Sequence, residues 1–565
     1  MADTAYDQQL QQAQKTFDEG KFSDAESILQ GMSPDDLKIY CNLVMVQYLQ
    51  GELDIEQAIA KLAPPSDSSD VATNSNNRKN GAAKARNITL LYEGHETAFY
   101  NRAVLYARAG LILEAAAILR SILAMSKYIS LKVLTYSLCL LHTVTRPAPK
   151  LGGSSRSKED EDLIQSVLNE RMEDITKDAE LLALVTAAFA DSSSVHEAFK
   201  NSNNNPMEQS IYLNNLGVFL MGDGKIGTAA LCFSKAMETS GQQPSSQFIQ
   251  QPVAYNAALC ALLNEDYEEA IKHLLSVQAV MRISPLFWVR FAEAAIGLVQ
   301  RHFRARQREE YERQQSAFSA LLQTGKVYAN FEFMLLPGAA TVTGPMQEPL
   351  KDSPAYTAAE QQAAVAIRNA LFLLIPKGHS LSSALDAFPE MAQVLQHASL
   401  YWVALELFRK NYQATNEVGE QLLNTHEKHP LPTTVHATLL SYMVEALIHL
   451  NDPSCALKVL RRASLSSLIN NPATESVDVA QRSRLEVLFI NLAVTHVLTG
   501  SWNQAHVIMD SVLAKLYEAA PSASNEYRPE REALFAYQML AIFLDLAQGN
   551  QEKAAEWLTK LNWPY

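Results

Sequence analysis

The stretch YLNNLGVFLMGDGKIGTAALCFSKAM, residues 212–237, decides the fold. It predicts a helical hairpin, with Gly217 in a first helix and Gly224 at a turn where a positive φ is needed. Small residues let two antiparallel helices approach closely, and larger ones fill the space beside them. The packing residues of this hairpin are Gly217, Ala229, Phe233 and Ala236. This alternation is the physical basis of the tetratricopeptide signature, whose period is about 34 residues.

The same frame recurs along the chain. It fits residues 98–122, 252–278 and 486–513 well, and a single first helix of this kind covers 285–297. The packing residues expected in the last three segments are Ala258, Ala270, Trp288, Ala493 and Ala505. Weaker units are expected at 8–32, 361–375, 398–423, 436–464 and 534–562. Because each hairpin has an apolar face that only a neighbour covers, the repeats predict an all-α, right-handed superhelical solenoid with a concave groove.

Breaks in the frame set the expected domain organisation. Segments rich in Pro, Ser, Asn and Gly interrupt the helices and are expected to be disordered loops. The predicted parts are N-terminal helical hairpins at 1–62, a disordered linker at 63–94, tetratricopeptide-like repeats at 95–336 with a loop at 146–160, a loop at 337–356, and C-terminal tetratricopeptide-like repeats at 357–565. Within the third part, residues 298–323 are expected to form a charged, solvent-facing helix of mixed sign.

Composition excludes several classes of protein. With 48% hydrophobic and 19% charged residues, the chain is expected to fold rather than stay disordered. A net charge of −14 opposes binding to nucleic-acid phosphates. The sequence shows neither a secretory signal nor an apolar run long enough to cross a membrane. Five cysteines without a CxxC pair indicate reduced thiols, as in proteins of the cytosol or nucleus. The expected location of the chain is cytoplasmic and nuclear.

Motifs for catalysis and for cofactors are missing from the sequence. It contains neither an HExxH zinc motif nor a G-x-S-x-G nucleophile turn. The segment GDGKIGT, residues 222–228, lacks the spacing of a phosphate-binding loop and follows a helix instead of a strand. The chain is therefore predicted not to be an enzyme, and we expect no cofactor and no metal.

An asparagine two residues before the small first-helix residue recurs in the four best repeats. These residues are Asn101, Asn215, Asn256 and Asn491. The position faces the concave groove in this architecture, where an amide could both donate to and accept from the backbone of a bound peptide. The alternative is that the amides satisfy a neighbouring helix or water. The adjacent groove positions hold Tyr100, Asn214, Tyr255 and Ile490 instead of cations, which disfavours a clamp for a C-terminal carboxylate.

Several segments, in the same order, resemble one family. They are YNRAVLYARAGLILEA (100–115), NNLGVFLMGDGKIGTAALCFSKAM (214–237), YNAALCALLNEDYEEAI (255–271), SPLFWVRFAEAAIG (284–297), AVAIRNALFLLIP (364–376), LFINLAVTHVLTGSWNQA (488–505) and FLDLAQGNQEKAAEWL (543–558). Together they resemble subunit ten of the CCR–NOT deadenylase complex, a tetratricopeptide-repeat protein. The resemblance spans about residues 95–560, whereas residues 1–94 match poorly.

The resemblance implies a scaffold without catalytic residues. Members of the family pair with subunit eleven and dock on the N-terminal region of the large Not scaffold, so a hetero-oligomer is expected. Their complex shortens mRNA poly(A) tails and represses translation. The sequence leaves an alternative open, namely an unrelated tetratricopeptide adaptor of a co-chaperone or transport complex that binds a peptide in its concave groove.

Overall fold

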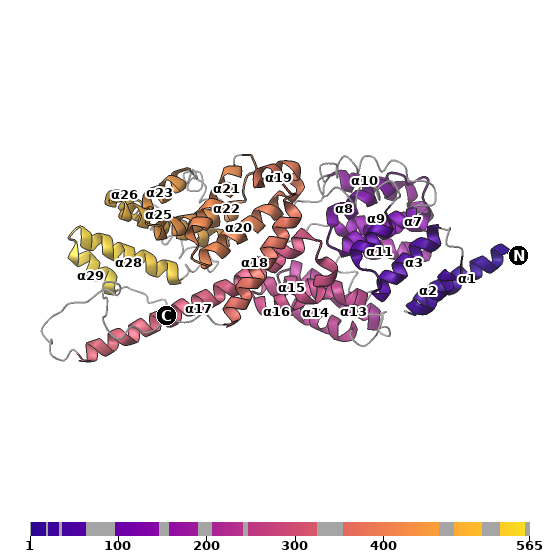
Figure 1. Ribbon diagram of the computed structural model, residues 1–565, viewed down its shortest axis with the longest axis horizontal. Helices are drawn as coiled ribbons and strands as arrows, with labels where there is room; N and C mark the ends of the chain where they lie inside the picture. The colour runs from indigo at the N-terminus through magenta and orange to yellow at the C-terminus, as the bar shows by residue number, and fades with distance from the viewer. Residues whose placement is uncertain are drawn as a thin grey trace. The chain divides into compact units, whose positions relative to one another are not determined.

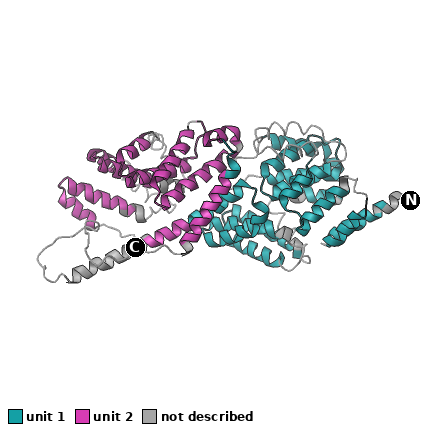
Figure 2. Ribbon diagram, viewed as in Figure 1, with its two compact units in different colours: residues 1–297, 372–378 teal, residues 298–371, 379–565 magenta. Residues whose placement is uncertain are grey.

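The computed structural model describes residues 2–18, 21–32, 37–63, 96–145, 158–189, 206–240, 247–324, 354–426, 428–462, 479–510 and 531–559. Every regular element in these ranges is a helix, which confirms the prediction of an all-α fold (Figure 1). The chain divides into two compact units, residues 1–297 with 372–378 and residues 298–371 with 379–565 (Figure 2).

Unit 1 begins at the N-terminus and ends inside a long helix. Its helices are α1 (Ala2–Asp18), α2 (Phe22–Gln30), α3 (Leu37–Gln50), α4 (Ile55–Lys61), α7 (Glu96–Arg108), α8 (Ile112–Leu123), α9 (Leu131–Val144), α10 (Lys158–Ile175), α11 (Ala179–Ala188), α13 (Pro206–Gly222), α14 (Ile226–Ser240), α15 (Gln247–Leu263), α16 (Tyr267–Met281) and the first part of α17 (Pro285–Thr324). Helices that follow each other pack side by side, as α13 does with α14 and α15 with α16.

Unit 2 contains the remainder of α17 and most of α18. Its elements are α18 (Pro354–Leu374), α19 (Leu381–Ala387), the 3-10 turn η3 (Pro389–Met391), α20 (Ala392–Phe408), α21 (Tyr412–Thr425), α22 (Thr433–His449), α23 (Pro453–Arg462), α25 (Val479–Leu498), α26 (Trp502–Ile508), α28 (Arg531–Ala547) and α29 (Gln551–Thr559). Here too the hairpin partners pack together, α20 on α21 and α28 on α29 among them.

One turn geometry recurs in eight hairpins across the described residues. One or two residues beyond the end of each first helix lies a turn residue with a φ between 58° and 81°. These turn residues are Gly51, Gly110, Gly224, Glu265, Lys410, Asn451, Gly500 and Gly549. The N–H after the turn residue donates to the carbonyl five residues before it, as Leu111 does to Tyr106 at 2.9 Å. The turn residue itself donates three residues back, which completes a Schellman cap. Because the cap is the same, the chain turns into the second helix in the same way in each hairpin.

Two positions around each turn are buried because the paired helices are closest there. Seven residues before the turn residue lie Val44, Ala103, Gly217, Ala258, Val403, Val444, Ala493 and Ile542, all buried. Five residues after it, in seven of these hairpins, lie Ala115, Ala229, Ala270, Thr415, Ala456, Ala505 and Ala554, each at most 1% exposed. The turn at Gly51 is two residues longer, and Ala58 takes the second position.

Gly217 shows why the first position must often be small. A Cβ atom added there would lie 2.7 Å from Cε1 of Phe233, on the facing helix α14. That distance is far inside van der Waals contact, so the ring of Phe233 occupies the space that glycine leaves. The pair is the small-against-large contact that the sequence frame predicts.

Helix bounds differ from the sequence frame in three places. Residues 285–297 and 298–323, expected as two elements, belong to one continuous helix, α17. Helix α10 begins at Lys158, inside the predicted loop 146–160, because Asp160 is buried and paired with Arg120 of α8.

Helix α18 begins at Pro354, inside the predicted loop 337–356. Proline at a first helical position starts a helix without losing a hydrogen bond. The remainder of both loops, and the predicted linker 63–94 beyond residue 63, lie outside the described residues.

Unit 1 also contains a contact between turns that are distant in sequence. The hydroxyl of Ser284 donates to the carbonyl of Gly110 at 3.2 Å, and the guanidinium of Arg282 pairs with Asp54 at 3.2 Å and with Glu56 at 3.1 Å. The α16–α17 turn therefore packs against the α3–α4 and α7–α8 turns. Stacking of sequence neighbours alone does not describe this unit.

Within the described ranges, no helix combines the length and the apolar character needed to span a membrane. All five cysteines are free thiols, and four of them are buried: Cys41, Cys139, Cys232 and Cys260. Burial raises the pKa of the Cys139 thiol to about 11. Such a thiol stays protonated and unreactive near neutral pH.

Candidate protein-interaction surface

The predicted groove asparagines all occupy one place in the repeating hairpin. Asn101, Asn215, Asn256 and Asn491 each lie nine residues before a turn residue, on a first helix. The structure adds a fifth, Asn42, which lies nine residues before Gly51. Asn42 was not among the residues predicted from the sequence, although its spacing to the turn glycine is the same. In two other hairpins of unit 2, Tyr401 and Tyr442 take this place.

Two of these asparagines, Asn256 and Asn215, are connected across neighbouring helices through Asn214. Nδ2 of Asn256 on α15 donates to Oδ1 of Asn214 on α13 at 3.0 Å. Nδ2 of Asn214 in turn donates to Oδ1 of Asn215 at 3.4 Å. The three amides therefore form a short polar row that crosses from one first helix to the next.

The amide row retains unused hydrogen-bonding capacity. A carboxamide has two N–H donors and an oxygen that accepts twice. Asn215 uses its oxygen in the row and Asn256 one of its donors, which leaves the amino group of Asn215 and the oxygen of Asn256 for other partners. Asn215 is exposed and Asn256 is half-buried, so both are within reach of a ligand. Spaced donors and acceptors of this kind suit the backbone of an extended or helical peptide.

Tyr255, next to Asn256 on α15, lies close enough to Arg290 and Glu293 of α17 to be affected by their charges. Burial raises the pKa of Tyr255 to about 12, while the nearby Arg290 opposes that shift and Glu293 adds to it. The phenol is therefore neutral at physiological pH and remains a hydrogen-bond donor. Arg290 lies two residues before Ala292, as the asparagines lie before their small residues, and its Nη1 is 2.6 Å from Oε2 of Glu293. Its charge is balanced by that carboxylate.

Exposed apolar side chains flank the amides on α13. Ile211, Val218 and Phe219 are 43%, 38% and 42% exposed, although each is large and apolar. Ile211, Asn215 and Val218 are spaced by four and three residues and so share one face of the helix. We call Ile211, Asn214, Asn215, Val218, Tyr255, Asn256 and Arg290 the inner face of α13, α15 and α17. It combines apolar anchors with unused amide groups, which is the chemistry of a protein-binding surface.

The other two predicted asparagines lie on helices that do not form this face. Asn101 lies on α7, next to Tyr100, whose ring is 6.0 Å from that of Tyr136 on α9. Burial raises the pKa of Tyr100 to about 12, with smaller effects from Tyr136 and Cys139. Asn491 lies on α25 in unit 2, where its backbone carbonyl accepts from Thr495 at 2.6 Å. The prediction that these two asparagines bind a peptide stays a prediction.

The expected packing residues lie in the interior. Ala229, Ala236, Ala258, Ala270, Ala493 and Ala505 are 0% exposed, Phe233 is 1% and Trp288 is 5% exposed, and Gly217 is buried against Phe233. Nε1 of Trp288 donates to the carbonyl of Arg282 at 2.6 Å, which fixes the turn that enters α17. Those in unit 1 position the inner face without contributing to its surface, and Ala493 and Ala505 pack a hairpin of unit 2.

A metal site would need several His, Cys, Asp or Glu side chains to converge among the residues that the structure describes. No group of three or more His, Cys, Asp or Glu side chains there is arranged to hold a metal ion. A cleft of about 190 Å³ between α14, α15 and α16 contains His273, which contacts Glu269 at 3.2 Å. Burial lowers the pKa of His273, so its imidazole is neutral at physiological pH. Nothing in this pair supplies a nucleophile, and the prediction that the chain is not an enzyme stays a prediction.

Comparison with known proteins gives two kinds of result. No family model matches the sequence, and no curated protein matches it either. Among solved structures, the chain is similar to a chain of the APC/C hetero-tetramer Cut9–Hcn1, with a TM-score of 0.32, 10% identity, and coverage of 94% of this chain and 95% of that one. It is also similar to yeast Tom70, with a TM-score of 0.28, 12% identity, and coverage of 98% and 97%.

Proposed function

We propose that this chain is a non-catalytic scaffold that binds a segment of a partner protein on the inner face of α13, α15 and α17. The observation that carries the proposal is the hydrogen bond between Asn256 and Asn214. It aligns amides of two consecutive hairpins into one row, in which the amino group of Asn215 and the oxygen of Asn256 have no hydrogen bond to the described residues. A partner segment that lies across the first helices would pair with this row and cover Ile211 and Val218.

The finer proposal is that the scaffold is a subunit of the CCR–NOT deadenylase complex. Its partners would be subunit eleven and the N-terminal region of the Not scaffold. The support is the ordered set of segments that resemble subunit ten of that complex between about residues 95 and 560. In this role the chain supports mRNA poly(A) shortening, mRNA turnover and translational repression in the cytoplasm and nucleus, without contacting RNA itself.

Affinity purification of the tagged full chain from its native cells tests this assignment. Mass spectrometry is expected to recover the Not scaffold, subunit eleven and the deadenylase subunits. If it recovers chaperones or transport-complex subunits instead, the alternative adaptor role replaces the finer proposal. Recovery of neither set under conditions that preserve complexes would contradict a scaffold role.

A surface variant tests where the partner binds. Asn215→Arg combined with Val218→Glu places two charges on exposed positions of α13, so the fold should persist while a complementary surface is lost. The matched control is Leu231→Glu on α14, where the side chain is 64% exposed and lies off the inner face. The double variant is expected to lose its partners and the control to keep them. Equal recovery by both variants would show that the inner face is not the binding surface.

A further inference from the structure

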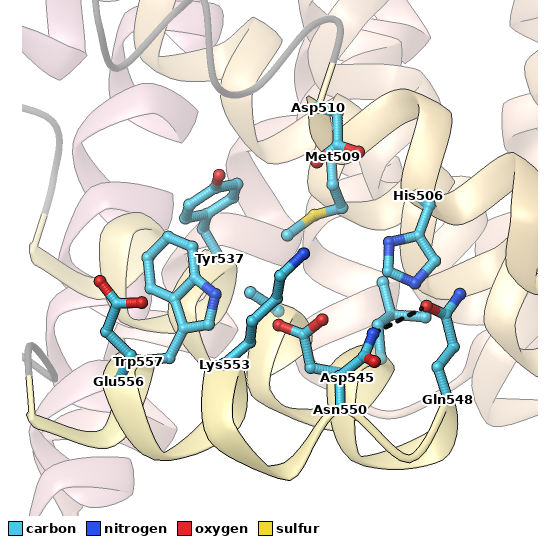
Figure 3. Close-up of a pocket in the computed structure, with 12 residues that line it drawn as sticks. His506, Met509, Asp510, Tyr537, Asp545, Gln548, Asn550, Lys553, Glu556 and Trp557 are labelled. Atoms are coloured by element: carbon cyan, nitrogen blue, oxygen red, sulfur yellow. Dashed lines mark hydrogen bonds between the residues drawn. The ribbon is translucent and has the colours of Figure 1, made fainter.

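The last hairpin of the described chain contains a second candidate binding site, a hollow of about 490 Å³ (Figure 3). It lies between α26, α28 and α29, far in sequence from the inner face described above. Met509, Tyr537 and Leu544 form buried parts of its wall. A hollow of this volume is large enough for a side chain together with part of the backbone that bears it.

Asp545 is the unusual member of the lining. Its side chain comes from α28 and is only 8% exposed. No hydrogen bond or ion pair joins its carboxylate to any residue that the structure describes. Its backbone carbonyl accepts from the N–H of Asn550 at 2.8 Å. Burying a carboxylate without a partner is unfavourable, so Asp545 lowers the stability of the fold. In Figure 3 it points into the hollow.

The charges around the hollow are mainly negative. Asp510 and Glu556 line it together with Asp545, against one lysine, Lys553. Lys553 is exposed and lies beyond the 4.0 Å of an ion pair with Asp545. Three carboxylates and one ammonium group therefore line the hollow. This imbalance selects a cation.

Aromatic rings make the hollow suitable for a planar cation. The rings of Tyr537 and Trp557 meet edge to face with their centroids 5.9 Å apart. Nε2 of His506, also in the lining, is buried and has no hydrogen-bond partner. A guanidinium group stacks on aromatic faces and binds a carboxylate through two parallel hydrogen bonds, which an ammonium group does not do.

We propose that this hollow binds an arginine side chain presented by a partner protein. The guanidinium pairs with the carboxylate of Asp545 and packs against the ring of Trp557, while Asp510 and Glu556 attract the cation from the rim. Lys553 competes weakly for the same carboxylate. The site is independent of the inner face of α13, α15 and α17, so either can fail without the other.

The test uses the full chain and two peptides, acetyl-Gly-Leu-Arg-Leu-Gly-amide and the same peptide with citrulline in place of arginine. Citrulline keeps the shape of arginine but is neutral. Binding followed by NMR chemical-shift changes of labelled tryptophan indoles is expected to be at least tenfold tighter for the arginine peptide. Asp545→Asn is expected to abolish this preference, and the matched control Asp510→Asn on the rim to change the affinity less than threefold. Equal binding of the two peptides would overturn the proposal.

Two further variants separate binding from a structural role. Lys553→Ala removes the competing cation and is expected to tighten arginine-peptide binding. Asp545→Asn removes the unpaired charge, so its melting temperature should equal or exceed that of the parent chain. If Asp545→Asn melts at a lower temperature, or if Lys553→Ala weakens binding, Asp545 serves the fold and the proposed site is wrong.

Discussion

Ser284 and Gly110 are hydrogen-bonded across 174 residues of sequence, hydroxyl to backbone carbonyl at 3.2 Å. The bond joins the α16–α17 turn to the α7–α8 turn, and Arg282 extends the junction to Asp54 and Glu56 on the α3–α4 hairpin. Early and late hairpins of unit 1 thereby support each other, and the junction lies next to the first residues of α17, which carries Arg290.

Gly110→Ala tests this junction. The new Cβ would lie 2.8 Å from Cε of Met281 and 2.9 Å from Oγ of Ser284, at a φ of 76° that disfavours alanine. Gly51→Ala is the matched control, because its φ of 80° carries the same backbone cost but no atom lies within 4 Å. We expect Gly51→Ala to lower the free energy of unfolding by about 1–2 kcal/mol and Gly110→Ala by a further ~1–3 kcal/mol. Equal losses in urea unfolding would mean that the junction does not form in solution.

Gly217→Ala tests the contact that defines the repeat. Overpacking against Phe233 is expected to destabilise the chain by about 1–3 kcal/mol. Gly227→Ala on α14 is the control, because a Cβ there meets nothing within 4 Å, and alanine in a helix is favoured over glycine by about 0.5–1 kcal/mol. The melting temperature should fall for Gly217→Ala and rise for Gly227→Ala. Phe233→Leu should rescue Gly217→Ala; failure to rescue would place the clash elsewhere.

The three hairpin turns without glycine give a graded prediction. Glu265, Lys410 and Asn451 adopt φ values of 58°, 60° and 58°. Left-handed backbone costs most residues about 1–2 kcal/mol, and asparagine less. Glu265→Gly and Lys410→Gly should therefore stabilise their hairpins by up to about 1 kcal/mol, and Asn451→Gly hardly at all. Hydrogen exchange of the flanking helices would report this. As a control, Glu268→Gly, inside α16, should destabilise; stabilisation by that change as well would contradict the turn assignment.

His436 makes the stability of unit 2 depend on pH. It is buried and stacks on His426 with ring centroids 4.3 Å apart. Burial lowers its pKa to about 4, and the charge of His426 adds to the effect. Below pH ~6.5 the imidazole of His436 binds a proton in the unfolded chain but stays neutral in the folded chain. Stability should therefore be full above that pH, and about 3 kcal/mol should be lost as the pH falls to about 4.

His436→Phe removes this dependence. The phenylalanine fills a similar space without a titrating group. The loss of unfolding free energy between pH 6.5 and 4 should therefore be smaller by the amount that His436 contributes. Chemical unfolding across this pH range measures it. The partly exposed His397, on α20, provides the control through His397→Gln, which should leave the profile unchanged. An identical profile for His436→Phe would show that His436 is not the source of the decline.

Much of the repeat could be predicted from the sequence, because glycine marks the turn in Gly110, Gly224 and Gly500. The hairpins that turn at Lys410 and Asn451 could be predicted only weakly, because no glycine marks these turns in the sequence. Lys410 and Asn451 nevertheless adopt the same positive φ. The continuity of α17 was not predicted, because the sequence changes from mainly apolar to mainly charged at residue 298. The helical backbone continues through this change.

The candidate sites were harder to predict than the fold. Spacing placed Asn215 and Asn256 correctly on first helices, but their link through Asn214 is a contact between residues 42 apart. No local pattern encodes such a contact. Asp545 gave no signal in the sequence either, because an aspartate in a helix is usually solvated and only burial distinguishes this one.

Binding between purified proteins tests the central claim most directly. Isothermal titration calorimetry of the full chain against a co-purified complex of subunit eleven and the N-terminal region of the Not scaffold should show saturable binding. Asn215→Arg with Val218→Glu should weaken it at least tenfold, and Leu231→Glu should leave it unchanged. Absence of heat and of co-elution with the parent chain, or unchanged affinity in the double variant, would contradict the account.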